Sequence, residues 1–170
     1  MKRFALIAIA LLVVSCGSNP PTQPSAGAPT FTATLLPANE NPAIVAPENT
    51  GSGTVTVTMN VTRDANQAIT AATATFVVNL TGFPANTPIN LAHIHEGDRT
   101  TNGPVRVNLG LANGEVVLAN GAGSFTKSNI NVDVNIANAL INGNTAGFYF
   151  NVHSQINPGG VARGQLAKTQ

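Results

Sequence analysis

Two of the three histidines in the chain lie two residues apart, as His93 and His95 in the run Leu-Ala-His-Ile-His-Glu-Gly-Asp at 91–98. Side chains two residues apart on a β-strand point to the same face, so a strand here sets the two imidazoles side by side. The third histidine, His153, ends a second strand-like run at 147–153. If the two strands lie close together in space, all three imidazoles converge.

Three neutral imidazoles suit zinc or copper as ligands and leave a fourth position for water. Such an open site binds metal reversibly or supports slow redox or hydrolytic chemistry. The alternative is a buried hydrogen-bond network that fixes a sandwich of low charge, in which the histidines join Glu96, Tyr149, Asn151 and Arg163. The residues alone leave both interpretations open.

Other ionisable residues support weaker hypotheses. Glu40 and Glu96 would make a carboxylate pair for general acid-base chemistry, but nothing in the sequence places them together. Asp98 fits the turn after its strand better than it fits a ligand position. We expect Arg163 to form an ion pair or a hydrogen-bond fork. No Ser/His/Asp or Cys/His nucleophile arrangement is indicated, so the residues do not point to an enzyme.

The first 15 residues have the pattern of a secretory signal. Lys2 and Arg3 form a short basic region, and residues 4–14 are almost uninterruptedly apolar. That run is too short to span a bilayer as a helix and is typical of a signal peptide, which we predict at 1–15.

The run Val-Val-Ser-Cys-Gly at 13–17 resembles the bacterial lipoprotein processing box. The resemblance implies cleavage before Cys16 and a lipid on its thiol, which would anchor the protein stably to a membrane. The alternative is an ordinary signal peptide in which the cysteine is incidental. Because Cys16 is the sole cysteine, an intramolecular disulfide is excluded. The lipoprotein interpretation places the protein in the cell envelope, at the outer membrane, in the periplasm or on the cell surface.

The composition favours an extracytoplasmic β-protein. Only 9% of the residues are charged, and Thr, Asn, Ala, Val and Gly are abundant. Without Lys2 and Arg3, the 8 basic residues become 6 against 7 acidic ones, a net charge near −1. No basic run or stripe is present, so we expect no nucleic-acid partner.

Residues 16–30 are rich in Pro, Ser and Gly and are predicted to be a disordered linker. Residues 54–61 alternate strictly between apolar and polar, which predicts a half-buried strand, and a turn at 64–67 leads to a returning strand at 69–80. Further strands are expected at 31–36, 89–95, 105–109, 124–132, 148–153 and 162–167. One short helix is expected at 134–141, capped by Asp133 and ended by Asn142-Gly143. About eight short strands favour an antiparallel sandwich or barrel.

These residues resemble a CHRD (chordin-type) domain over 31–166. The resemblance rests on Phe-x-Ala-x-Leu at 31–35 with Asn-Glu-Asn-Pro at 39–42, the two histidine runs, Gly-Pro-Val at 103–105 and the closing segment 157–166. This chain departs from the family at Asn41 and in the inserted Gly-Val-Ala at 160–162. The resemblance implies one β-sandwich domain, which we place at 31–168, of a kind found in secreted and bacterial extracytoplasmic proteins.

The chain is also similar, more weakly, to copper/zinc superoxide dismutase. A strand there carries His-Val-His-Glu and a Gly-Asp, a later Val-His corresponds to 152–153, and a late Gly-x-Arg corresponds to Arg163. This similarity implies a Greek-key sandwich in which His93, His95 and His153 are three of four copper ligands. The fourth histidine, which bridges copper to zinc, is absent, and so is the disulfide, so rapid dismutation is not expected.

Three functions remain open on the sequence. The first is a non-enzymatic binding module whose histidine cluster holds copper or zinc. The second is a degenerate relative of superoxide dismutase with slow copper redox activity. The third is a structural domain, or one that binds an unidentified protein partner, without metal or other cofactor.

Overall fold

The strictly alternating run at 54–61 lies inside strand β2 (Ser52–Arg63), which pairs in antiparallel register with β3 (Ile69–Thr81). Val55, Val57 and Met59 are fully buried on one face of β2. Between the strands, the Asp64 carboxylate accepts hydrogen bonds from the backbone N–H groups of Asn66 and Ala68. The predicted hairpin is therefore confirmed, and its turn is held by the side chain of Asp64.

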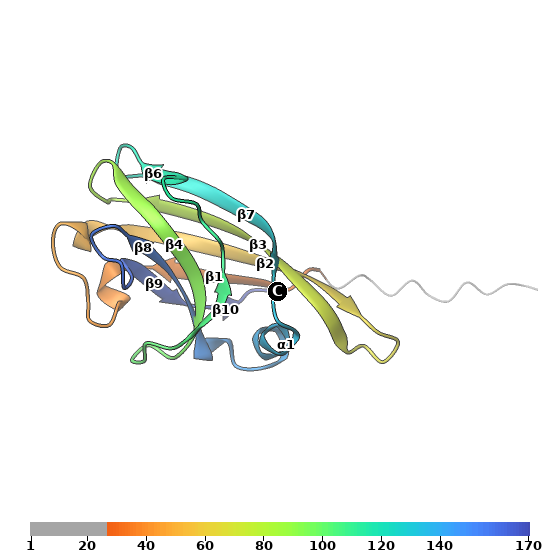
Figure 1. Ribbon diagram of the computed structural model, residues 1–170. Coiled ribbons are helices and arrows are strands. Elements are labelled where there is room, and N and C mark those ends of the chain that lie inside the picture. Colours follow the sequence, from red (N-terminus) through yellow and green to blue (C-terminus); the bar gives the residue numbers. More distant parts are fainter. Residues whose placement is uncertain (1–26) are drawn as a thin grey trace, which may run out of the picture.

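The computed structural model describes residues 27–170, which form two antiparallel sheets packed face to face (Figure 1). The first sheet has the order β10-β1-β2-β3-β7, and its remaining strands are β1 (Thr30–Leu35), β7 (Gly123–Asn131) and β10 (Ala167–Lys168). The second has the order β5-β4-β8-β9, with β4 (Thr87–Glu96), β5 (Val105–Asn108), β8 (Phe148–Ser154) and β9 (Ala162–Gln165). A short strand, β6 (Val116–Leu118), also pairs with β4.

The strand order is that of a Greek key. The chain leaves β3 for the second sheet, forms β4, β5 and β6, and then returns to lay β7 beside β3. The predicted all-β antiparallel sandwich is confirmed. It contains ten strands rather than about eight, because β6 has only three residues and because Leu166 separates β9 from β10. The predicted signal peptide (1–15), Cys16 and most of the predicted linker (16–30) lie outside the described residues.

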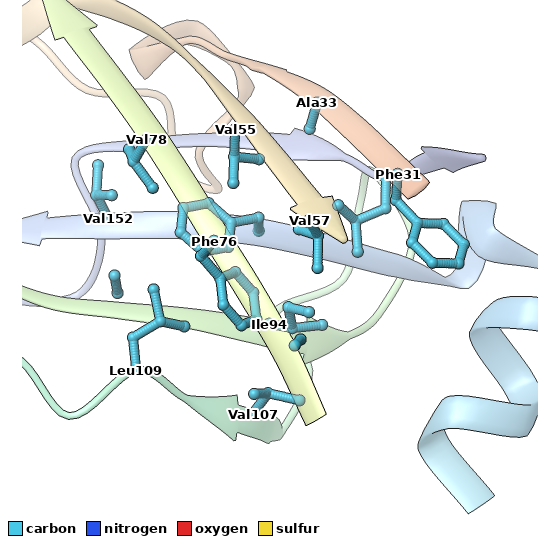
Figure 2. Close-up of a cluster of buried hydrophobic side chains, with 14 of the residues drawn as sticks. Phe31, Ala33, Val55, Val57, Phe76, Val78, Ile94, Val107, Leu109 and Val152 are labelled. Carbon is cyan, nitrogen blue, oxygen red and sulfur yellow. The ribbon is translucent and has the colours of Figure 1, made fainter. Parts of the chain in front are cut away.

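Apolar side chains from both sheets fill the space between them. In Figure 2, Val55, Val57 and Phe76 extend from the first sheet toward Ile94 and Val152 of the second. The ring of Phe76 stacks on that of Phe150, with 6.0 Å between centroids. Burial of this apolar surface is the main contribution to the stability of the sandwich.

The predicted helix forms as α1 (Val134–Asn142), and the Asp133 carboxylate accepts from the backbone N–H groups of Asn135 and Ile136 at its start. Ala137, Leu140 and Ile141 of α1 are buried against the core. Among residues 27–170, no helix is long and apolar enough to cross a membrane.

Loops cover the outer face of the second sheet, the face turned away from the core. Three are involved: 36–51, which contains the 3-10 turns η1 (Pro37–Asn39) and η2 (Glu48–Thr50), 97–104, and 155–161. A third 3-10 turn, η3 (Thr145–Gly147), precedes β8. Because the core covers one face of β8 and these loops cover the other, every residue of β8 is buried. Polar side chains on the outer face of β4, β8 and β9 are thus enclosed although they lie outside the core.

Candidate metal centre

The pairing of β4 with β8 places the three histidines together. His93 lies opposite Asn151, and His153 lies two residues further along β8, opposite Leu91. The intervening residues Ala92, Ile94 and Val152 point into the core. Because side chains alternate along a strand, the histidines point outward under the loops.

The three imidazoles are close and almost fully enclosed. Nδ1 of His93 lies 3.1 Å from Nε2 of His153. The rings of His93 and His95 have centroids 5.5 Å apart, and one nitrogen from each histidine lies within 4.8 Å of the others. His93 and His153 are 6% exposed and His95 is 9% exposed. The structure thus brings together all three residues that the sequence singled out.

Backbone carbonyls orient two of the rings. Nδ1 of His95 donates to the Gly103 carbonyl at 2.8 Å, and Nδ1 of His153 donates to the Pro158 carbonyl at 2.8 Å. A carbonyl oxygen can only accept, so each neutral ring carries its single proton on Nδ1 and a lone pair on Nε2. Histidines that bind metal through one nitrogen are commonly held in this way through the other.

The two unprotonated Nε2 atoms differ in their surroundings. Nε2 of His95 is buried without a hydrogen-bond partner. Nε2 of His153 faces Nδ1 of His93, at a distance close to the about 3.3 Å that separates two nitrogen ligands of one tetrahedral zinc ion. The ligand nitrogens lie at most 4.8 Å apart. To reach the about 3.3 Å of a tetrahedral ion, the two nitrogens that are furthest apart would have to approach by about 1.5 Å, which requires only small ring movements. These residues therefore form a group that can hold a metal ion.

Burial keeps the histidines neutral. Removal from water lowers the pKa of His93 to about 4, and electrostatic repulsion between a protonated His93 and His153 or His95 acts in the same direction. Burial also lowers the pKa of His153 and of His95, although the hydrogen bonds to Pro158 and Gly103 oppose the change. Since a metal competes with protons for these nitrogens, neutral rings are ready to bind an ion at pH 7.

Arg163 of β9 lies at the centre of the loops that cover the site. Its Nε donates to the Asn39 carbonyl at 2.6 Å, and its terminal nitrogens donate to the Arg99 carbonyl at 2.7 Å and the Asn102 side chain at 2.9 Å. Its guanidinium also lies 4.5 Å from the centre of the Tyr149 ring, whose other face stacks on His95. The expected hydrogen-bond fork is present, and it ties two loops to the sheet.

The carboxylate near the cluster is Glu40, which the sequence did not place there. Burial raises the pKa of Glu40 to about 7, against the opposing effects of Arg163 and of a hydrogen bond from Asn151. Glu96 instead lies at the surface and pairs with Arg106 at 2.7 Å, so it belongs neither to the network nor to a pair with Glu40. The only available signal for Glu40 was its position in the Asn-Glu-Asn-Pro run.

Asp98 serves the turn after β4, as expected, since its carboxylate accepts from the backbone N–H and the hydroxyl of Thr100. It takes no part in the histidine cluster.

Comparison with known proteins identifies the family. No curated protein matches the chain. The CHRD domain, a domain of extracellular type, matches residues 31–166, a range that contains the histidines, Glu40 and Arg163. The similarity to superoxide dismutase stays a prediction. The protein belongs to the CHRD domain family.

Proposed function

We propose that this CHRD domain is a non-enzymatic, extracytoplasmic binding protein that holds one zinc or copper ion between His93, His95 and His153. We also propose that a lipid on Cys16 keeps it at the membrane. The convergence of three imidazole nitrogens within 4.8 Å is the observation that carries the metal proposal.

The chemistry of the cluster supports an ion rather than a hydrogen-bond network alone. In the metal-free chain, Nδ1 of His93 donates to Nε2 of His153, so a hydrogen bond explains the approach of these two rings. The buried Nε2 of His95 is left with a lone pair and no donor. An unpartnered buried acceptor costs about 1–3 kcal/mol, and a bound cation would remove that cost.

The enclosure of the cluster supports retention of an ion rather than turnover of a substrate. The three rings are at most 9% exposed. In the part of the chain that the structure describes, no serine, threonine or cysteine side chain forms a hydrogen bond to a histidine, as a nucleophile would.

The test is a direct titration with Zn²⁺ and Cu²⁺ of the chain that lacks residues 1–15 and carries Cys16→Ser, which removes the only thiol. We expect one ion per chain, and we expect each of His93→Gln, His95→Gln and His153→Gln to weaken binding at least about tenfold. Glu48→Gln is the control, because Glu48 is fully buried but contacts Ser154 and Asn157 instead of the histidines.

If the unsubstituted chain binds neither ion stoichiometrically, the metal proposal is wrong. The histidines would then be hydrogen-bond groups of a structural or protein-interaction domain.

The lipid anchor rests on the sequence around Cys16 and has its own test. Mass spectrometry of the N-terminal peptide should find a diacylglycerol on the Cys16 thiol, and Cys16→Ser should move the protein from the membrane fraction to the soluble fraction. An unmodified cysteine in a membrane-bound protein would contradict this part of the proposal.

A further inference from the structure

Asn151 lies on β8 directly opposite His93, between the histidine cluster and Glu40. It is 2% exposed, so both ends of its carboxamide need partners within the protein. Neither the metal proposal nor the sequence motifs explain why an asparagine occupies this position.

The Glu40 carboxylate determines which end of the carboxamide faces the histidines. Both Glu40 oxygens and Nδ2 of Asn151 surround one point beside Gly160, at 2.8, 2.8 and 2.9 Å from where a Cβ of residue 160 would lie. A hydrogen bond from Asn151 also lowers the pKa of Glu40. Because the NH2 group is the only donor of a carboxamide, the Nδ2 end belongs on the Glu40 side. Oδ1 is therefore turned to the histidines, where it lies 3.1 Å from Nε2 of His153.

This last contact joins two acceptors. His153 uses its one proton on Nδ1 to bond to the Pro158 carbonyl, so its Nε2 offers a lone pair to an oxygen that also has only lone pairs. Two buried acceptors at this distance repel, and the proton beside them, on Nδ1 of His93, is donated to Nε2 of His153 rather than to Oδ1. Nε2 of His95 adds a further lone pair without a donor.

We propose that Oδ1 of Asn151 is the fourth ligand of the metal held by the three histidines, which closes the coordination sphere. This inference rests on the proposed function. Four protein ligands are characteristic of sites that hold zinc permanently, whereas sites that act on substrates keep a position for water. A carbonyl oxygen is also a hard ligand, so it favours a divalent ion over cuprous copper. Glu40 and Gly160 are positioning residues, since they orient the carboxamide without touching the ion.

The first measurement needs no variant. Water-proton relaxation of the Cu²⁺-loaded chain reports whether an exchangeable water is bound directly to the ion. A closed site predicts no such water in the unsubstituted protein, and Asn151→Ala should introduce one. A bound water in the unsubstituted protein would overturn the inference.

The second measurement compares Zn²⁺ affinities by competition with a chromophoric chelator. We expect Asn151→Ala to weaken binding about 10- to 100-fold. The matched control is Asn157→Ala, since Asn157 is half-buried and donates to Glu48 at 2.6 Å, so the variant loses an Asn–Glu contact that includes no histidine. We expect its Zn²⁺ affinity to change less than about twofold.

The results separate the two proposals. If the unsubstituted chain binds Zn²⁺ tightly and Asn151→Ala binds it equally well, the fourth-ligand inference is wrong and the three-histidine site stands. If the unsubstituted chain binds no ion, the proposed function fails and the inference fails with it.

Discussion

Nδ1 of His93 and Nε2 of His153 lie 3.1 Å apart although 60 residues separate them in the chain. Antiparallel pairing of β4 with β8 brings them together, and the Pro158 carbonyl turns Nε2 of His153 toward its partner. The separation is close to the about 3.3 Å expected for two ligands of one tetrahedral ion. These two nitrogens therefore already have nearly the separation that a shared ion requires.

Gly160 leaves room for the Glu40 carboxylate and the Asn151 carboxamide. A Cβ at this position would lie 2.8 Å from both carboxylate oxygens, and the φ of +135° is one that other residues rarely adopt. We expect Gly160→Ala to displace both side chains and to weaken Zn²⁺ binding about tenfold or more, measured by chelator competition. A Cβ at Gly159 meets nothing within 4 Å, so Gly159→Ala should bind as the unsubstituted chain does. Equal affinities for the two variants would contradict the role assigned to Gly160.

The neutral histidines make the metal-free protein sensitive to acid. The unfolded chain takes up a proton on His93 below its ordinary pKa of 6.5, whereas the folded chain takes it up only near pH 4. The unfolding free energy should therefore fall between pH 6.5 and 4, with a contribution of up to about 3 kcal/mol from His93. Burial lowers the pKa of His95 and His153 in the same direction.

Urea unfolding in the presence of a chelator, at several pH values from 7 to 4.5, measures this effect. His93→Gln should lose stability less steeply than the unsubstituted protein as the pH falls. Parallel curves would show that His93 is not held in its neutral form by the fold.

Glu40 should act in the opposite direction. Its pKa is raised from 4.5 to about 7, so the folded chain holds a proton that the unfolded chain has already lost. That contribution to stability is present below pH 4.5 and is lost as the pH rises through 7. We expect the midpoint of thermal unfolding of metal-free Glu40→Gln, relative to the unsubstituted protein, to rise between pH 5 and 8. A difference that does not change with pH would show that burial does not raise this pKa.

Arg163 should stabilise the loops through the geometry of its hydrogen bonds as well as through its charge. It is 1% exposed and donates to the backbone carbonyls of Asn39 and Arg99, which belong to two different loops. Lysine keeps the charge but not the planar set of donors, so Arg163→Lys should lower the unfolding free energy by about 2–4 kcal/mol in urea. The same substitution at Arg106, which is exposed and pairs with Glu96, should cost less than about 1 kcal/mol. Similar losses at both positions would contradict this role.

Much of the fold could be predicted from local patterns. The alternation at 54–61 predicts the β2 hairpin, and Asp133 predicts the start of α1, because both signals arise within one element. The strand β6 could not be predicted, since its three residues are too few to show a period and it forms by pairing with β4. The split between β9 and β10 also depends on their partners, because β9 pairs with β8 of the second sheet and β10 pairs with β1 of the first.

The site could be predicted only in part. The spacing of His93 and His95 predicts that they share a face, but the approach of His153 depends on strand order, which only the family resemblance supplied. Glu40 lies 111 positions before Asn151, in a loop and directly after the 3-10 turn η1. No periodic pattern predicts such a contact.

The central claim is that three imidazoles bind one ion, each through one defined ring nitrogen. Two-bond ¹H–¹⁵N NMR spectra of the histidine rings, recorded during a Zn²⁺ titration, test it most directly. We predict that all three rings change together and saturate at one equivalent, with Nε2 of His95 and His153 and Nδ1 of His93 as the shifted nitrogens. If any ring keeps its metal-free nitrogen shifts at saturation, or if saturation needs a second equivalent, the three histidines do not share one ion.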